Sequence, residues 1–166
     1  MDLSSWFRET LRTGADGFLW AVEQVPRERW YATPPGGLGE WNVARHVFHM
    51  VLYERLIAVP SMRQWMGGEK PMLDDVVEAE LWGEEKELEP LIEEFQALRD
   101  TQIALCDSFG EEAWSAVRDT IWTGPEPWGS ITLKWVVSKT FQHTAEHTHD
   151  VMRLALFWDF RVAREQ

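Results

Sequence analysis

The last amphipathic segment of the chain reads ITLKWVVSKTFQHTAEHTHDVMRLALFW over residues 131–158. Residues of one face recur there at intervals of three or four, the period of an α-helix that buries one side. We therefore predict a helix from about Ile131 to Phe157, with Thr132 as its N-cap. Its buried stripe is Leu133, Val136, Thr140, His143, His147, Val151, Leu154 and Trp158. Two histidines thus occupy positions where such a helix usually carries leucine.

The same period recurs in three earlier segments, which cover about residues 5–25, 42–59 and 87–109. Pro26 ends the first of them, because proline cannot continue a helix, and Asn42 is a plausible N-cap of the second. Four amphipathic helices predict an all-α fold, a four-helix bundle with one long crossover connection. A chain of 166 residues is long enough for one domain and short for two, so residues 1–166 are expected to form a single domain.

The connections between these segments are rich in turn residues. Pro60 need not stop the second helix, whereas Gly67-Gly68 must. The stretch 68–81 is the long crossover, with room for a short helix of its own. Segments 34–39 and 123–129 lead into the second and fourth helices, so we expect them at the rim of a site built on those helices. No run with the alternation of a β-strand is found, and no strand is expected.

Charge and aromatic content restrict the partners. The net charge is −12 and no stripe of Lys and Arg offsets it, which disfavours binding to nucleic acid or to an anionic membrane. Eleven tryptophans exceed what a core of this size needs, so some should line a pocket or an interface. No apolar run of 18 residues and no signal peptide are found, so we expect a cytoplasmic protein. A single cysteine, Cys106, excludes an internal disulfide and is predicted to be a buried, inert thiol.

The histidines point to a metal site. His143 and His147 are one helical turn apart, so their imidazoles project from one face and can bind the same ion. A third imidazole from a facing helix would leave positions open for water or substrate. The second helix offers His46 and His49, and spacing alone does not choose between them. The alternative is that these are core histidines satisfied by hydrogen bonds; His149 points elsewhere and is expected at the surface.

Other catalytic motifs do not fit. The zinc motif His-Glu-x-x-His is absent, and a di-iron bundle needs Glu-x-x-His on two helices. Only Glu146-His147-Thr148-His149 has that spacing, and it occurs once. We therefore keep the three-histidine site as the leading hypothesis.

The segment Glu40-Trp41-Asn42-Val43-Ala44-Arg45-His46-Val47-Phe48-His49 resembles the second-helix signature of the DinB-like superfamily of small bacterial four-helix bundles. In that family the ligand histidine falls eight residues after the tryptophan, which favours His49 over His46. The family's His-x-x-x-His motif on the fourth helix is matched by His143 and His147. The resemblance covers nearly the whole chain and implies metal ligands at these three positions.

The resemblance also implies a function. Characterised relatives include bacillithiol S-transferases and a mycothiol-dependent maleylpyruvate isomerase. We therefore expect a metal-dependent enzyme that activates a low-molecular-weight thiol, or else water, for attack on an electrophilic small-molecule substrate. Three neutral imidazoles suit a divalent ion such as Zn²⁺, Ni²⁺, Fe²⁺ or Mn²⁺. Tyr53, Glu146 and Asp150 could support the ligands, with ordinary packing or surface placement as their alternative.

Two other classes of function stay open at this point. One is a non-catalytic, metal-stabilised helical module that acts through a dimer interface. The other is a metal-free bundle that binds an apolar small molecule between tryptophan-rich loops. A homodimer is expected from the family and is compatible with exposed aromatic residues.

Overall fold

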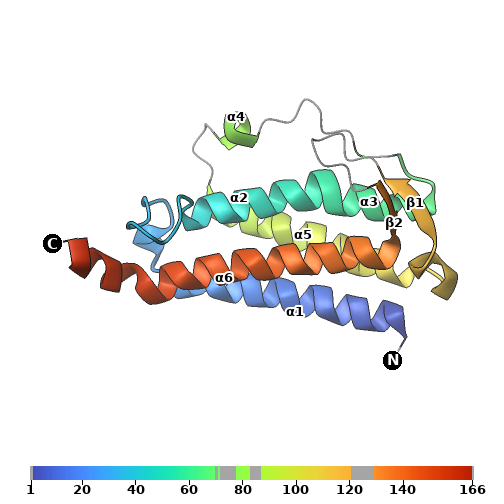
Figure 1. Cartoon of the computed structure of the whole chain (residues 1–166), viewed down its shortest axis with the longest axis horizontal. Helices are drawn as coiled ribbons and strands as arrows, with labels where there is room; N and C mark the ends of the chain where they lie inside the picture. The colour runs from blue at the N-terminus through green and yellow to red at the C-terminus, as the bar shows by residue number, and fades with distance from the viewer. Residues whose placement is uncertain (1, 70, 72–77, 83–86, 121–128, 166) are drawn as a thin grey trace.

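The computed structural model describes residues 2–69, 71, 78–82, 87–120 and 129–165 (Figure 1). The described residues form four long helical rods that lie side by side: α1, α2 with its continuation α3, α5 and α6. The prediction of an all-α four-helix bundle is confirmed. The bounds of the four main helices are Leu3–Gln24 for α1, Val43–Tyr53 for α2, Leu88–Asp107 for α5 and Leu133–Glu165 for α6.

The helix ends follow from local sequence. Asp2 caps α1 by accepting a hydrogen bond from the backbone N–H of Ser5 at 2.8 Å. Asn42 caps α2 in the same way, through the N–H of Arg45, as the sequence predicts. The fourth helix extends beyond the predicted end at Phe157, and Figure 1 shows its last turns running past the other long helices.

The second rod continues through Pro60, also as predicted. It passes from α2 into a π-helical turn at Glu54–Ala58, then α3 at Val59–Arg63 and a 3-10 turn at Gln64–Met66. Pro60 cannot donate a helical hydrogen bond, and its ring displaces the carbonyl one turn earlier, where the π-helical turn lies. The rod ends at Gly67, whose φ of 83° is left-handed and favours glycine.

The prediction that the chain has no β-strand is wrong. Strands β1 (Val117–Thr120) and β2 (Gly129–Thr132) pair in antiparallel register, with Val117 opposite Thr132. Four residues are too few to show alternation, so their pairing depends on tertiary structure rather than on local pattern. Thr132 ends β2, and its hydroxyl oxygen also accepts from the N–H of Trp135 at 3.3 Å, which fits its predicted capping role.

The crossover carries a short helix, α4, at Glu78–Trp82. The rest of the predicted crossover is described only at residues 68, 69 and 71, and residues 123–128 of the other loop lie outside the described part of the chain. Short 3-10 helices complete the described elements, at Arg27–Arg29 and Glu111–Trp114.

The core fills the space between the rods. Phe18 of α1 packs edge-on against Phe95 of α5, with ring centroids 5.3 Å apart. Cys106 is fully buried and unpaired, as predicted, and burial raises the pKa of its thiol to about 12. No helix in the described part of the chain is long and apolar enough to cross a membrane.

Candidate metal centre

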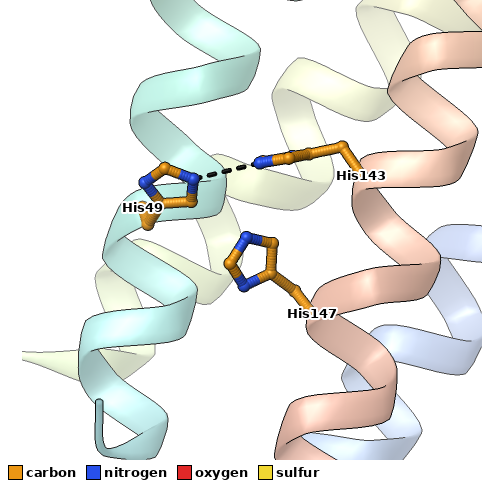
Figure 2. Close-up of side chains that lie close together, drawn as sticks. All are labelled: His49, His143 and His147. Atoms are coloured by element: carbon orange, nitrogen blue, oxygen red, sulfur yellow. Dashed lines mark hydrogen bonds between the residues drawn. The ribbon is translucent and has the colours of Figure 1, made fainter. Parts of the chain in front are cut away.

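Three histidines converge between α2 and α6 (Figure 2). His49 comes from α2, and His143 and His147 come from successive turns of α6. One ring nitrogen from each lies within 4.8 Å of the other two. His49 Nε2 and His143 Nε2 are 3.0 Å apart. The structure thus brings together the three residues that the sequence pattern and the resemblance selected.

The donor set fits a divalent ion. Two nitrogens bound to tetrahedral zinc at their usual bond length lie roughly 3.3 Å apart, close to the separation of His49 and His143. Burial, followed by the charges of the neighbouring histidines, lowers the pKa of His143 to about 2. Burial and His49 likewise lower the pKa of His147 to about 4, which Glu78 partly opposes. At neutral pH these rings therefore carry the lone pairs that a metal ion requires.

His49 is oriented by a residue that the sequence did not reveal. Glu78 of α4 accepts a hydrogen bond from His49 Nδ1 at 2.8 Å, and its other carboxylate oxygen pairs with Arg45 at 2.8 Å. Desolvation opposes ionisation of Glu78, but the hydrogen bond from His49 and the charges of His49 and Arg45 keep its pKa below the usual range. This hydrogen bond places a proton on His49 Nδ1 and directs Nε2 towards His143.

His46 lies beside the centre as well. Its Nδ1 is 2.8 Å from His147 Nδ1, and its side chain is buried. Burial and the charges of His147 and His49 lower the pKa of His46 to about 3. The choice between His46 and His49 therefore has a structural answer: only His49 joins His143 and His147 in one group, while His46 contacts the other nitrogen of His147.

Trp41 forms an aromatic wall against these rings. Its indole lies parallel to His147 with centroids 5.9 Å apart, and it contacts His46 and His49 at 5.4 and 5.0 Å. The guanidinium of Arg45 lies 5.1 Å from the Trp41 ring. At least one of the eleven tryptophans thus lines the site, as the composition suggested.

The three predicted supporting residues differ in position. The ring of Tyr53 stacks on His143 with centroids 4.0 Å apart, and burial raises the pKa of its hydroxyl. Asp150 lies within 4.8 Å of nitrogens of His46 and His147. Glu146 is exposed and accepts a hydrogen bond from Gln142 at 2.8 Å. His149 is exposed, in agreement with its predicted surface position.

A cavity of about 420 Å³ adjoins the centre. It is lined by residues 38–41 and by His46, His147, Asp150 and Arg153. This volume falls in the usual range for small-molecule sites. Leu38 and Gly39 belong to the loop predicted at the rim, which the structure therefore places as expected.

A second polar cluster lies deeper, between α1, α5, α6 and the π-helical turn. Arg99 donates to the Glu54 carboxylate at 2.5 Å, to the Thr144 hydroxyl at 2.9 Å and to the carbonyl of Leu11 at 3.1 Å. Glu54 and Arg99 are almost completely buried. Neither member of this ion pair was predicted from the sequence.

Comparison with known proteins places the chain in a family. Residues 10–151 match the family model of the DinB superfamily. This span contains α2, α5 and every histidine discussed above. Among curated proteins, none matches the chain.

Proposed function

The chain belongs to the DinB superfamily, and we propose that it is a divalent-metal-dependent enzyme that activates a small thiol for attack on an electrophile. His49, His143 and His147 would hold the ion. The observation that carries this proposal is the convergence of three ring nitrogens within 4.8 Å, on two helices, beside a cavity that His147 also lines. Activation of water in place of the thiol is a variant of the same chemistry.

Three protein ligands are the number found in catalytic rather than structural zinc sites. A divalent ion there would supply Lewis acidity, which lowers the pKa of a thiol or of water towards neutrality. The identity of the ion within the set Zn²⁺, Ni²⁺, Fe²⁺ and Mn²⁺ belongs to the proposal, since imidazole suits all four. A cytoplasmic location, where small thiols stay reduced, belongs to it too.

The remaining side chains have separate tasks in this scheme. Glu78 and His46 keep the rings of His49 and His147 in place through hydrogen bonds. Trp41 packs against the ring of His147, and Tyr53 packs against the ring of His143. The guanidinium of Arg153 and the carboxylate of Asp150 are the charged groups of the cavity wall on α6, where they can anchor a polar substrate.

Metal analysis tests the centre. Wild-type protein purified without chelators should hold about one ion per chain, and His143→Ala should lose it. His149→Ala is the matched control, because His149 is an exposed histidine on the same helix. Equal metal content in all three proteins would contradict the assignment of His49, His143 and His147 as metal ligands.

Thiol conjugation tests the reaction. Metal-loaded wild type and His143→Ala are assayed with a reactive electrophile and a panel of cellular thiols, each metal in turn. We expect turnover with at least one thiol and its loss in His143→Ala. Full metal occupancy without turnover for any thiol would instead support the second candidate, a metal-stabilised dimeric module.

The second candidate needs a dimer interface, and exposed aromatic residues on α1 and α6 offer one. Trp6 and Trp20 of α1 and Phe141, Phe157 and Phe160 of α6 are all at least 40% exposed. A homodimer that covers them forms part of either proposal. Sedimentation should give twice the 19.4 kDa of one chain, and a monomer at high concentration would contradict it.

A further inference from the structure

We propose that His46, His147 and Asp150 form an outer cation site, from which a divalent ion passes to the three-histidine centre. One donor atom from each lies within 4.8 Å of the other two. Two imidazoles and a carboxylate are a donor set that binds zinc in enzymes. The inference rests on the metal centre of the proposed function but not on its thiol chemistry.

The three residues of the outer site lie at different depths between the solvent and the interior of the bundle. All three of its residues line the cavity of about 420 Å³. The side chain of Asp150 is 43% exposed, whereas His46 is only 6% exposed. An ion arriving from solvent would therefore meet the carboxylate first and could exchange its water for imidazole nitrogens one at a time.

The charges around Asp150 allow a cation to bind to its carboxylate. Arg153 is the cation nearest to Asp150 in this wall, but its closest nitrogen is 3.8 Å away. Another nitrogen of the same guanidinium donates to the carbonyl of Gly37 at 2.7 Å. Asp150 is thus incompletely neutralised, and the net charge of −12 draws cations towards the chain as a whole.

His147 belongs to both groups, which couples them. Figure 2 shows one of its nitrogens on the side of His49 and His143 and the other on the opposite side. The second nitrogen, Nδ1, is the atom that faces His46. A neutral imidazole has one N–H and one lone pair, so His147 can serve only one of the two sites at a time.

Transfer of the ion inwards therefore requires a change of tautomer at His147. With the ion in the outer site, Nδ1 provides the lone pair and Nε2 carries the proton. With the ion in the centre, the proton has moved to Nδ1, where it is donated to His46 Nδ1. The 2.8 Å contact between these two atoms matches the second arrangement.

Titration of Co²⁺ into metal-free protein tests the outer site by itself. His143→Ala removes the centre, and we expect it to bind one Co²⁺ more weakly than wild type. Adding Asp150→Asn should weaken this binding at least tenfold. Adding Glu40→Gln instead is the matched control, since Glu40 lines the same cavity and the change removes the same charge; we expect less than a threefold effect.

The outcomes separate the two proposals. Tight Co²⁺ binding that His143→Ala leaves unchanged would overturn the three-histidine centre. No Co²⁺ binding by His143→Ala at millimolar concentration, or equal effects of Asp150→Asn and Glu40→Gln, would overturn the outer site. Circular dichroism of each variant checks that the bundle is folded.

The rate of uptake tests the transfer. In a chain with all three inner histidines, Asp150→Asn should slow Co²⁺ uptake at least tenfold and leave the equilibrium affinity within about threefold. Stopped-flow absorbance of the bound Co²⁺ follows both quantities. Uptake by Asp150→Asn as fast as by Glu40→Gln would show that the ion does not enter through this site.

Discussion

Two polar clusters occupy neighbouring parts of the bundle, and adjacent residues of α6 serve them. Thr144 contacts the buried pair of Glu54 and Arg99, while His143 faces His49. The side chains of Glu54 and Arg99 are 0% and 2% exposed, whereas those of Glu78 and His49 are 27% and 22% exposed. One cluster is sealed between helices and the other adjoins a cavity.

The difference indicates what each cluster can do. A sealed ion pair has no room to exchange partners, so each charge compensates the other, and removing either one leaves an unpaired buried charge. The partly exposed cluster contains imidazoles whose nitrogens converge, which favours an additional cation. Position relative to solvent therefore separates a structural cluster from a binding one, although both use charged residues.

Loss of Arg99 should give the largest effect on folding. Burial raises the pKa of Glu54, and the charge and hydrogen bond of Arg99 oppose this. Arg99→Ala leaves a buried carboxylate without its partner, which should cost about 3–5 kcal/mol of unfolding free energy. Urea unfolding measures the change. Arg55→Ala, which breaks an exposed pair with Glu94, is the control and should cost under about 1 kcal/mol. Similar costs for both variants would show that the deeper cluster is not structural.

Metal removal should come next and should act only on the histidine cluster. An ion at one hundred times its dissociation constant stabilises the folded state by about 2.7 kcal/mol. A chelator should therefore lower the unfolding free energy of wild type by this amount and that of His143→Ala by much less, because only the weaker outer site remains there. Thermal unfolding with and without chelator measures it. An equal effect of the chelator on both proteins would show that the histidine cluster does not bind the ion that stabilises the fold.

A substitution at Glu78 tests the link between orientation and ion binding. Glu78→Gln keeps the size of the side chain but weakens its hold on His49 Nδ1. Loss of such a partner typically lowers metal affinity about 10–100-fold. Co²⁺ titration measures the affinity, and urea unfolding of the metal-free chain should change by less than about 1 kcal/mol. Glu94→Gln is the control, because Glu94 pairs with Arg55 on the surface; an equal effect on affinity would contradict the role of Glu78.

The helices and the three central histidines were predictable because their signals are local. The stripe of α6 repeats every three or four residues, and His143 and His147 fall within that repeat. The choice of His49 needed the family resemblance, since His46 is also close to the site. Periodicity places residues on a helix face, but it does not rank two residues that share the face.

The residues that were missed depend on contacts between distant segments. Glu78 belongs to the crossover, where no period relates it to His49. Arg99 lies one turn after Phe95 on the buried face of α5, yet a search for apolar positions passes over a charged residue. Its burial becomes understandable only with Glu54, which is 45 residues earlier in the chain.

The smallest effect is expected at Glu146, which the sequence proposed as a residue near the ligands. Its carboxylate is exposed and accepts a hydrogen bond from Gln142, so water screens its charge from the rings. Glu146→Gln should therefore change Co²⁺ affinity by no more than about twofold, within the usual effect of an exposed charge. The same titration compares it with Glu78→Gln. A tenfold loss of affinity would mean that solvent exposure does not distinguish residues that support the ligands from residues that have no effect on them. The comparison with the buried pair of Glu54 and Arg99 would then not hold.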